Sequence, residues 1–264
     1  MIETRSNLHL KYSSAKSLLM WHLLNKRLDL ILVSEFPKSG GTWFCQMLSK
    51  AIDVPFPRNV TPKFEESIMH SHFTYHKNFQ DIIYIVRDGR DIMVSAFYYI
   101  LNLKENANNT RAIRYRKDLG FKDTEDIQSK LPKFIDYFMQ NYKVLGKTTN
   151  WQEHVKHHLA KPHIHIVKYE DLLKDSAGEL QSALQFLNRK PLGDLAAIAE
   201  EYTFENQSKR KPGQEKKTAF LRKGIAGDWK NNFTKEAAVL FDQYAGQQLI
   251  DLGYEKDRNW IDEL

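Results

Sequence analysis

Residues 30–48 read LILVSEFPKSGGTWFCQML, an apolar β-branched run that breaks at a proline and then resumes with helical spacing. This order predicts a strand, a tight turn and a helix. Gly40 and Gly41 let the backbone approach a ligand with its N–H groups turned inward, and the helix N-terminus adds a partial positive charge. A cation and two hydroxyls come from Lys38, Ser39 and Thr42. The sequence therefore predicts that a phosphate-like anion binds at this turn.

The position of the lysine separates two classes of phosphate-binding loop. In the loop of nucleoside triphosphatases, GxxxxGK[ST], the lysine follows the glycines. Here Lys38 precedes them. The run PKSGGTW, residues 37–43, resembles the 5′-phosphosulfate loop, roughly PKSGTTW, of the sulfotransferases that use 3′-phosphoadenosine 5′-phosphosulfate (PAPS). An ordinary strand–helix connection would explain the glycines, but not the lysine, the hydroxyls and Trp43 together.

A second apolar run, IIYIVRDGRD at residues 82–91, ends at Arg87. Ligands of open α/β sheets bind beyond the carboxyl ends of the strands, so Arg87 should face the same crevice as the first loop. The stretch resembles the 3′-phosphate site of the same family, in which an arginine and a serine eight residues later, here Ser95, hold the phosphate. The alternative role for the arginine is a salt bridge to Asp88 or Asp91.

The third motif, FLRKGIAGDWKNNFT at residues 220–234, resembles the C-terminal signature of the family, RKGxxGDWKNxFT, at every fixed position. The resemblance implies that Arg222, Lys223 and the backbone N–H of Gly224 complete the 3′-phosphate site, with Leu221 in the same donor-binding segment. A guanidinium fork matches a tetrahedral anion bidentately. A basic, aromatic stretch can also bind nucleic acid, but the match in sequence favours the phosphate. The remaining fixed positions are interpreted as scaffold: Gly227, Asp228, Trp229 and Asn231.

Aromatic side chains are expected to bind the adenine of the donor by stacking. Trp43 is one candidate. Tyr169, in the segment HIVKYEDL, resembles the adenine-contacting tyrosine of the family, and Phe204 resembles the phenylalanine of its SF pair. Two residues before this phenylalanine the cytosolic branch usually has threonine, whereas this chain has Tyr202. The contact with the adenine edge is therefore left open.

Transfer of a sulfuryl group needs an in-line nucleophile and stabilisation of charge on the departing oxygen, as phosphoryl transfer does. Lys38 suits the second task. The acceptor hydroxyl also needs a base, for which histidine is suited near neutral pH. The segment IMHSHF, residues 68–73, resembles the KTHL segment that carries the catalytic histidine of the family. This register makes His72 the base and puts His70 where many relatives have lysine; His70, or a different base, is the alternative.

Three apolar runs, Leu30–Val33, Ile82–Val86 and His163–Val167, alternate with segments of helical periodicity and predict an α/β fold with a parallel sheet. The length of 264 residues suits one domain, residues 1–264. The resemblance covers about residues 30–234 and implies a five-stranded parallel sheet flanked by helices, related to nucleotide kinases.

Two polar segments, 104–130 and 207–217, are expected to form surface loops. With residues 54–76 they would build the pocket for the acceptor, where the resemblance is weakest. The short run VPFPRNVTP at 54–62 suits a small alcohol, phenol or lipid, and the basic residues 111–122 suit an acidic glycan. A solvated surface explains those charges equally well.

Composition limits location and partners. The net charge of +6 favours anionic ligands without the dense basic blocks of a nucleic-acid-binding tail, and the single cysteine, Cys45, suits a buried structural role. No export signal and no run of about 20 apolar residues is found, so a cytoplasmic location is expected. No metal is implied, and no Asp, His or Cys cluster has metal-ligand spacing along the sequence. The dimer motif of the cytosolic enzymes is not matched, since Val239 stands at its glutamate position.

Two other classes of protein remain as alternatives. A small-molecule kinase would need ATP, Mg²⁺ and an acidic residue after a strand, for which Asp88 is the nearest and a poor candidate. A protein that binds the adenosine bisphosphate or a nucleic acid without chemistry would keep Arg87, Ser95, Arg222 and Lys223 but tolerate loss of His72 and Lys38. Donor binding and turnover, measured separately, distinguish these alternatives.

Overall fold

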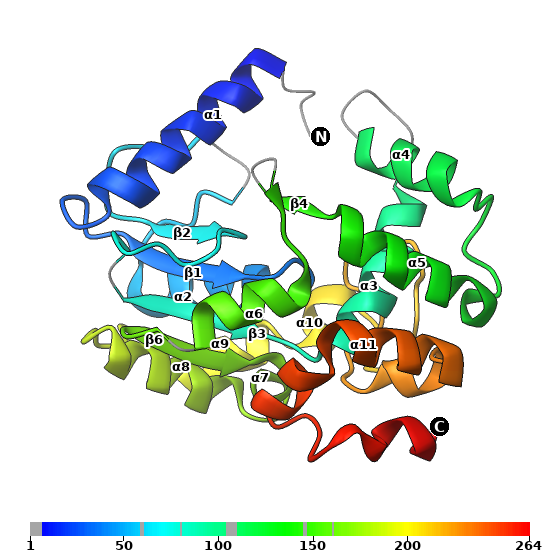
Figure 1. The fold of residues 1–264 in the computed structure, drawn as a ribbon. Helices are drawn as coiled ribbons and strands as arrows, with labels where there is room; N and C mark the ends of the chain where they lie inside the picture. Colours follow the sequence, from blue (N-terminus) through cyan, green and yellow to red (C-terminus); the bar gives the residue numbers. More distant parts are fainter. Residues whose placement is uncertain (1–6, 59–60, 80, 104–109, 145–146, 160) are drawn as a thin grey trace. The chain divides into compact units, whose positions relative to one another are not determined.

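The computed structural model describes residues 7–264, apart from 59–60, 80, 104–109, 145–146 and 160 (Figure 1). It divides into two compact units. The sheet unit comprises Met1–Glu35, Gly40–Ile85 and His158–Tyr202, and the helical unit comprises Phe36–Ser39, Val86–His157 and Thr203–Leu264. The organisation of the whole chain as one domain stays a prediction.

The described part of the chain contains a four-stranded main sheet in the order β2 (Ile68–Ser71), β1 (Ile31–Glu35), β3 (Ile82–Val86), β6 (Ile164–Lys168). β1 pairs in parallel with both β2 and β3. The predicted α/β class is confirmed, with four strands where the resemblance implies about five. Three of these strands lie within a residue or two of the apolar runs seen in the sequence, and β2 is the strand that periodicity did not reveal.

Both faces of the sheet carry apolar packing, and every residue of the adjacent strands β1 and β3 is buried. On one face Ile31, Val33 and Ile83 pack against α2 (Gly41–Ile52), α8 (Ser176–Phe186) and α9 (Leu195–Glu201). On the other face Leu32 and Ile82 pack against Trp21 of the π-helical turn η1 (Met20–Leu24), which continues α1 (Asn7–Leu19). Figure 1 shows β2, β1 and β3 side by side, with their labels in this order.

The helical unit is built around aromatic side chains. The rings of Phe97 and Phe134 meet edge to face at 5.3 Å, and those of Trp151 and Phe241 lie 5.9 Å apart. Its elements are α3 (Gly89–Asn102), α4 (Thr110–Leu119), α5 (Ile127–Asn141), the hairpin β4 (Lys143–Val144) and β5 (Lys147–Thr148), most of α6 (Trp151–Leu159), α10 (Phe204–Ser208), η2 (Asp228–Asn231), α11 (Lys235–Asp251) and η3 (Arg258–Glu263). The short helix α7 (Tyr169–Lys174) follows β6 in the sheet unit.

The prediction of a surface loop over 104–130 is wrong for much of that segment, because α4 and the start of α5 lie within it. Ala112, Tyr115 and Leu119 are buried along one side of α4, and Arg116 donates to the carbonyl oxygen of Leu101 at 2.6 Å. The charged residues between them concealed this apolar spacing. Of the second predicted loop, 207–217, residues 207–208 belong to the short helix α10 (Phe204–Ser208), whereas residues 209–217 contain neither helix nor strand.

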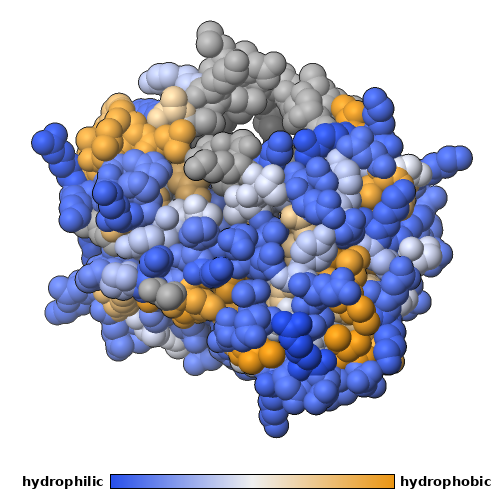
Figure 2. All heavy atoms as spheres, viewed as in Figure 1, coloured by the Kyte–Doolittle hydropathy of each residue, from blue (hydrophilic) through white to orange (hydrophobic). Residues whose placement is uncertain are grey.

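The surface of the protein and the position of its cysteine can be compared with the expectations from composition. Hydrophilic residues cover most of the face drawn in Figure 2, and in the described chain no helix is both long and apolar enough to cross a membrane. Cys45 is fully buried in α2, in agreement with the predicted structural role.

Candidate functional site

The predicted strand, turn and helix are present at residues 31–52. Gly40 takes the left-handed conformation, with φ of 102°, directly before the first residue of α2. A Cβ atom at this position would lie 2.7 Å from the ring of Tyr169, so glycine is required by both conformation and space. The turn is closed by Ser39, whose backbone N–H and hydroxyl both donate to the carbonyl oxygen of Phe36. The N-terminus of α2 thus provides the positive end of a helix dipole at the turn.

Lys38 keeps a positive charge beside this turn within an aromatic environment. Its Nζ atom lies 4.3 Å from the ring centre of Tyr99 and 4.8 Å from that of Phe220, both distances at which a cation is attracted to a ring face. Its φ of 79° is unusual for a residue with a side chain. Arg87 donates to the Lys38 carbonyl oxygen at 3.3 Å, which ties the first motif to the second.

The residues of the predicted 3′-phosphate site in the helical unit are linked by carboxylates. Asp228 accepts hydrogen bonds from Arg222 at 2.6 Å and from Lys223 at 2.5 Å. Burial opposes ionisation of Asp228, but the bonds from Lys223 and Arg222 hold the pKa of this carboxyl below its ordinary value. Arg87 lies 3.5 Å from the carboxylate of Asp91, the salt bridge considered as its alternative role. Ser95 is partly buried on the second turn of α3.

The carboxylate of Asp91 also organises the C-terminal signature. It accepts from the backbone N–H of Gly227 at 2.8 Å and from that of Trp229 at 2.9 Å. Burial raises the pKa of Asp91, and Arg87 opposes this effect. The neighbouring Arg90 is buried with its guanidinium 3.7 Å from the Trp229 ring centre. These contacts agree with a scaffold role for the fixed residues of the signature.

The aromatic residues predicted for adenine fall into two groups. In the sheet unit, Trp43 donates from Nε1 to the Tyr202 carbonyl oxygen at 2.8 Å, and its ring lies 6.0 Å from that of Tyr169 in an edge-on arrangement. In the helical unit, a Cβ atom at Gly224 would lie 2.3 Å from the ring of Phe204. Leu221 lies in the irregular segment before Gly224, where its carbonyl oxygen accepts from Arg210. Their contacts with a nucleotide stay predictions.

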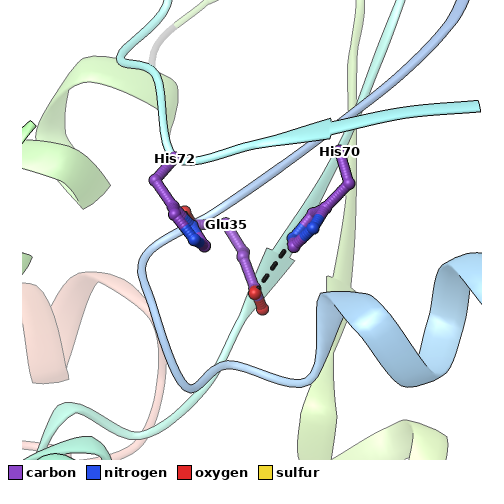
Figure 3. A group of neighbouring side chains, drawn as sticks. All are labelled: Glu35, His70 and His72. Atoms are coloured by element: carbon purple, nitrogen blue, oxygen red, sulfur yellow. Dashed lines mark hydrogen bonds and ion pairs between the residues drawn. The ribbon is translucent and has the colours of Figure 1, made fainter. Parts of the chain in front are cut away.

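The register of β1 and β2 brings together a carboxylate and two histidines. Val33 lies beside His70 and Ser34 beside Ser71. Because paired residues share a face and side chains alternate, Glu35, His70 and His72 all point to the face that carries α2. Figure 3 shows the three side chains converging, with the Nε2 atom of His70 3.0 Å from Oε1 of Glu35.

The hydrogen bonds of the His70 and His72 rings involve different ring nitrogens, and this difference decides which nitrogen of each ring carries the proton. His72 places Nδ1 3.1 Å from the Glu35 carbonyl oxygen. A carbonyl oxygen can only accept, so Nδ1 carries the proton and the lone pair of the neutral ring lies on Nε2. In His70 the nitrogen that contacts Glu35 is Nε2. His72 therefore has the tautomer that a base requires at Nε2.

Glu35 was not among the predicted site residues. Burial disfavours its charge, but the hydrogen bond from His70, the electrostatic interaction with the imidazoles of His70 and His72 and the N–H of Gly41 together hold its pKa below the ordinary value. Gly41 N–H donates to Oε2 at 2.5 Å. A Cβ atom at Gly41 would lie 2.8 Å from both the Glu35 carboxyl carbon and His70 Nε2, so this glycine makes room for the pair.

Comparison with known proteins identifies the family. The family model described as "Sulfotransferase domain" matches residues 57–253. The chain is 27% identical over 272 residues to sulfotransferase 1E1 of Homo sapiens, with 84% of each chain covered. It is 26% identical to sulfotransferase 2B1 of Mus musculus, with 90% of this chain and 76% of the relative covered.

Solved structures share the fold. The crystal structure of mouse sulfotransferase SULT7A1 complexed with PAP superimposes with a TM-score of 0.64 at 22% identity, over 96% of this chain and 94% of that one. Retinol dehydratase in complex with androsterone and PAP gives a TM-score of 0.58 at 16% identity, over 91% and 86%. The chain belongs to the sulfotransferase family. Two of these structural neighbours, SULT7A1 and retinol dehydratase, were solved with PAP, the adenosine bisphosphate of the donor that the three motifs predict.

Proposed function

We propose that this enzyme moves the sulfuryl group of PAPS to the hydroxyl group of an acceptor by in-line attack and releases adenosine 3′,5′-bisphosphate (PAP). The new bond forms between the acceptor oxygen and sulfur as the bond from sulfur to the 5′-phosphate oxygen breaks. The hydroxyl proton passes to Nε2 of His72. The observation that carries this proposal is the hydrogen bond from His72 Nδ1 to the Glu35 carbonyl oxygen, because it sets the tautomer of the base.

Lys38 is proposed to stabilise the charge that develops on the departing phosphate oxygen. Its contacts with the faces of Tyr99 and Phe220 are compatible with a charged ammonium. A preorganised cation acts on developing charge without reorganisation at the moment of reaction. The hydroxyl of Thr42 and the backbone of Gly40 and Gly41 would complete the contacts of the 5′-phosphosulfate, with Ser39 closing the turn.

The 3′-phosphate is proposed to bind Arg87, Ser95, Arg222, Lys223 and the Gly224 backbone. Asp228 forms salt bridges with two of these cations, Arg222 and Lys223, and Asp91 contacts a third, Arg87. Cationic side chains that are already held in place lose less conformational entropy when a ligand binds. The structural neighbours solved with PAP support the same class of donor for this chain.

The acceptor is proposed to be a small alcohol or phenol, a lipid or a glycan. Structures of retinol dehydratase have been solved with androsterone and with retinol, both of which are apolar alcohols. Apolar alcohols and phenols are therefore the first compounds to test, followed by acidic glycans. The cytoplasmic location stays a prediction, and the family dimer is not carried over to this chain.

Calorimetric titration in EDTA tests the donor site. Wild-type protein should bind PAP in preference to ATP and 5′-AMP without metal. Arg222→Ala should weaken PAP binding roughly 10- to 150-fold, as expected for loss of a charge-assisted hydrogen bond of about 1.5–3 kcal/mol. Lys230→Ala, an exposed cation in the same signature, is the matched control and should bind PAP as wild type does. A preference for ATP would contradict the proposal.

A further inference from the structure

We propose that Glu35, His70 and His72 form a binding site for one divalent transition-metal ion of the zinc class, and that its occupation stops sulfuryl transfer. Metal binding itself does not depend on the proposed function. The consequence for turnover does, because it rests on His72 as the base. The two parts are therefore tested by separate measurements.

The ligand atoms already lie close together. One atom from each of the three residues falls within 4.8 Å of the others, and Glu35 Oε1 is 3.0 Å from His70 Nε2. Zinc bonds to nitrogen and carboxylate oxygen are about 2.0–2.2 Å long, so neighbouring ligands of a tetrahedral ion lie roughly 3.3 Å apart. The ion would take the place of the proton that His70 and Glu35 now share. The separation of this pair then needs to change by only a few tenths of an ångström.

Hydrogen bonds outside the cluster orient two of the three ligands. His72 donates from Nδ1 to the Glu35 carbonyl oxygen at 3.1 Å, which presents Nε2 as the ligating nitrogen. Oε2 of Glu35 accepts a hydrogen bond from the Gly41 N–H at 2.5 Å, and Oε1 is the oxygen that faces His70. Metal-ligating histidines in proteins usually donate their second nitrogen to a carbonyl or carboxylate in this way. Glu35 is the last residue of β1, His70 lies in β2, and His72 directly follows the last residue of β2.

The set of ligands and its burial select the kind of metal. The side chains of Glu35 and His70 are 5% and 13% exposed, so a carboxylate charge is held largely out of water. Two imidazoles and one carboxylate suit zinc, cobalt, nickel or copper, whereas magnesium and calcium prefer oxygen ligands alone. Three protein ligands also leave the fourth tetrahedral position for water.

Occupation of the site has a direct chemical consequence. A metal ion on Nε2 of His72 uses the lone pair that must accept the proton of the acceptor hydroxyl. The base is then lost for as long as the ion is bound, and a chelator restores it. Zinc should therefore act as a reversible inhibitor of this enzyme, while magnesium should not.

Cobalt titration of tag-free, chelator-treated protein without nucleotide tests the site. The visible absorption of four-coordinate Co²⁺ should saturate at one ion per chain and disappear when zinc is added. His70→Gln and His72→Gln should each weaken binding at least about 100-fold, because loss of outer partners alone costs 10–100-fold. His163→Gln is the matched control, since His163 is an exposed histidine that also faces a carboxylate, that of Asp81 at 3.2 Å.

Turnover provides the second measurement. Zinc should inhibit the wild-type enzyme, EDTA should reverse the inhibition, and His70→Lys should lose the sensitivity to zinc. This variant carries the residue that many relatives have at the position, and circular dichroism checks its fold. Cobalt binding that is absent, or that both histidine variants retain, overturns the proposal. Stoichiometric cobalt binding by a protein that transfers no sulfuryl group would leave the metal site standing and contradict the proposed function instead.

Discussion

The carboxylate of Asp91 accepts a hydrogen bond from the backbone N–H of Trp229 at 2.9 Å, which joins the second motif to the third across 138 positions of sequence. The other oxygen of Asp91 accepts from Gly227, so the start of α3 fixes the backbone of the C-terminal signature. Arg87 contacts the carboxylate of Asp91 as well. Asp228, which lies between Gly227 and Trp229 in the signature, forms a salt bridge with Arg222. The buried carboxylate of Asp91 therefore orders both parts of the proposed 3′-phosphate site, the part that contains Arg87 and the part that contains Arg222.

Asp91→Asn should destabilise the protein by about 1–3 kcal/mol, because an amide nitrogen cannot accept and one buried N–H loses its partner. PAP affinity should fall together with stability. Urea denaturation and calorimetry measure the two effects. Asp262→Asn, which breaks an exposed pair with Lys235, should cost less than about 1 kcal/mol. Equal effects of the two substitutions would show that Asp91 does not order the signature.

The stability contributed by Asp228 should depend on pH. Its pKa in the folded chain lies below the ordinary value of 3.8, so the unfolded chain takes up the proton first as the pH falls. The contribution is complete above that value and is lost as the pH falls through the folded pKa. The variant Asp228→Asn lacks this contribution. The difference in free energy of unfolding between wild type and the variant should therefore shrink as the pH falls from about 5 to 3. A difference that stays constant over this range would contradict the pairing with Arg222 and Lys223.

His72→Ala should lower kcat by about 10²–10⁴-fold while PAP binds with unchanged affinity, as expected for a general base. His70→Ala separates the two histidines, since a positioning residue should cost less than the base. Single-turnover transfer from labelled PAPS and calorimetry with PAP measure chemistry and binding separately. His157→Ala, at an exposed position of α6, is the control. A larger loss in the His70 variant would reassign the base.

Gly224→Ala should destabilise the protein more than Gly213→Ala. Both glycines have positive φ, 66° and 90°, so alanine costs about 1–2 kcal/mol of backbone strain at each position. Gly213 has open space where a Cβ atom would stand, whereas at Gly224 this atom would meet Phe204. Thermal unfolding measures the difference, and PAP affinity should fall only in the Gly224 variant. Equal melting temperatures would show that Phe204 moves aside without cost.

The sequence predicted the elements whose pattern is local. The apolar runs of β1, β3 and β6 and the turn before α2 are continuous in the chain, and each was found. β2 has only four residues, IMHS, in which periodicity has too little length to appear. In α4, charged residues outnumber Ala112, Tyr115 and Leu119, the buried positions that define its inner side.

The sequence predicted the site residues that belong to a continuous motif. It missed contacts between residues that are distant in the sequence and come together only in the fold. The register of β1 against β2 brings Glu35 to His70, 35 residues away, and no spacing along the chain encodes that register. Asp91 was predicted only as a possible salt-bridge partner of Arg87, a contact that the structure contains. Its hydrogen bonds to Gly227 and Trp229 of a different motif were missed. A carboxylate directly before the phosphate loop was the visible signal for Glu35, but its role depends on a strand that the sequence did not reveal.

The burial of Cys45 gives the protein a built-in reporter of local opening. Burial, reinforced by the nearby Glu35 carboxylate, raises the pKa of this thiol well above its ordinary value, so in the closed sheet unit it is both shielded and protonated. A thiol reagent reacts with the thiolate, which forms readily only once α2 separates from its neighbours. Labelling kinetics of unmodified protein would therefore report opening around α2 in the sheet unit, because Cys45 is the single cysteine of the sequence.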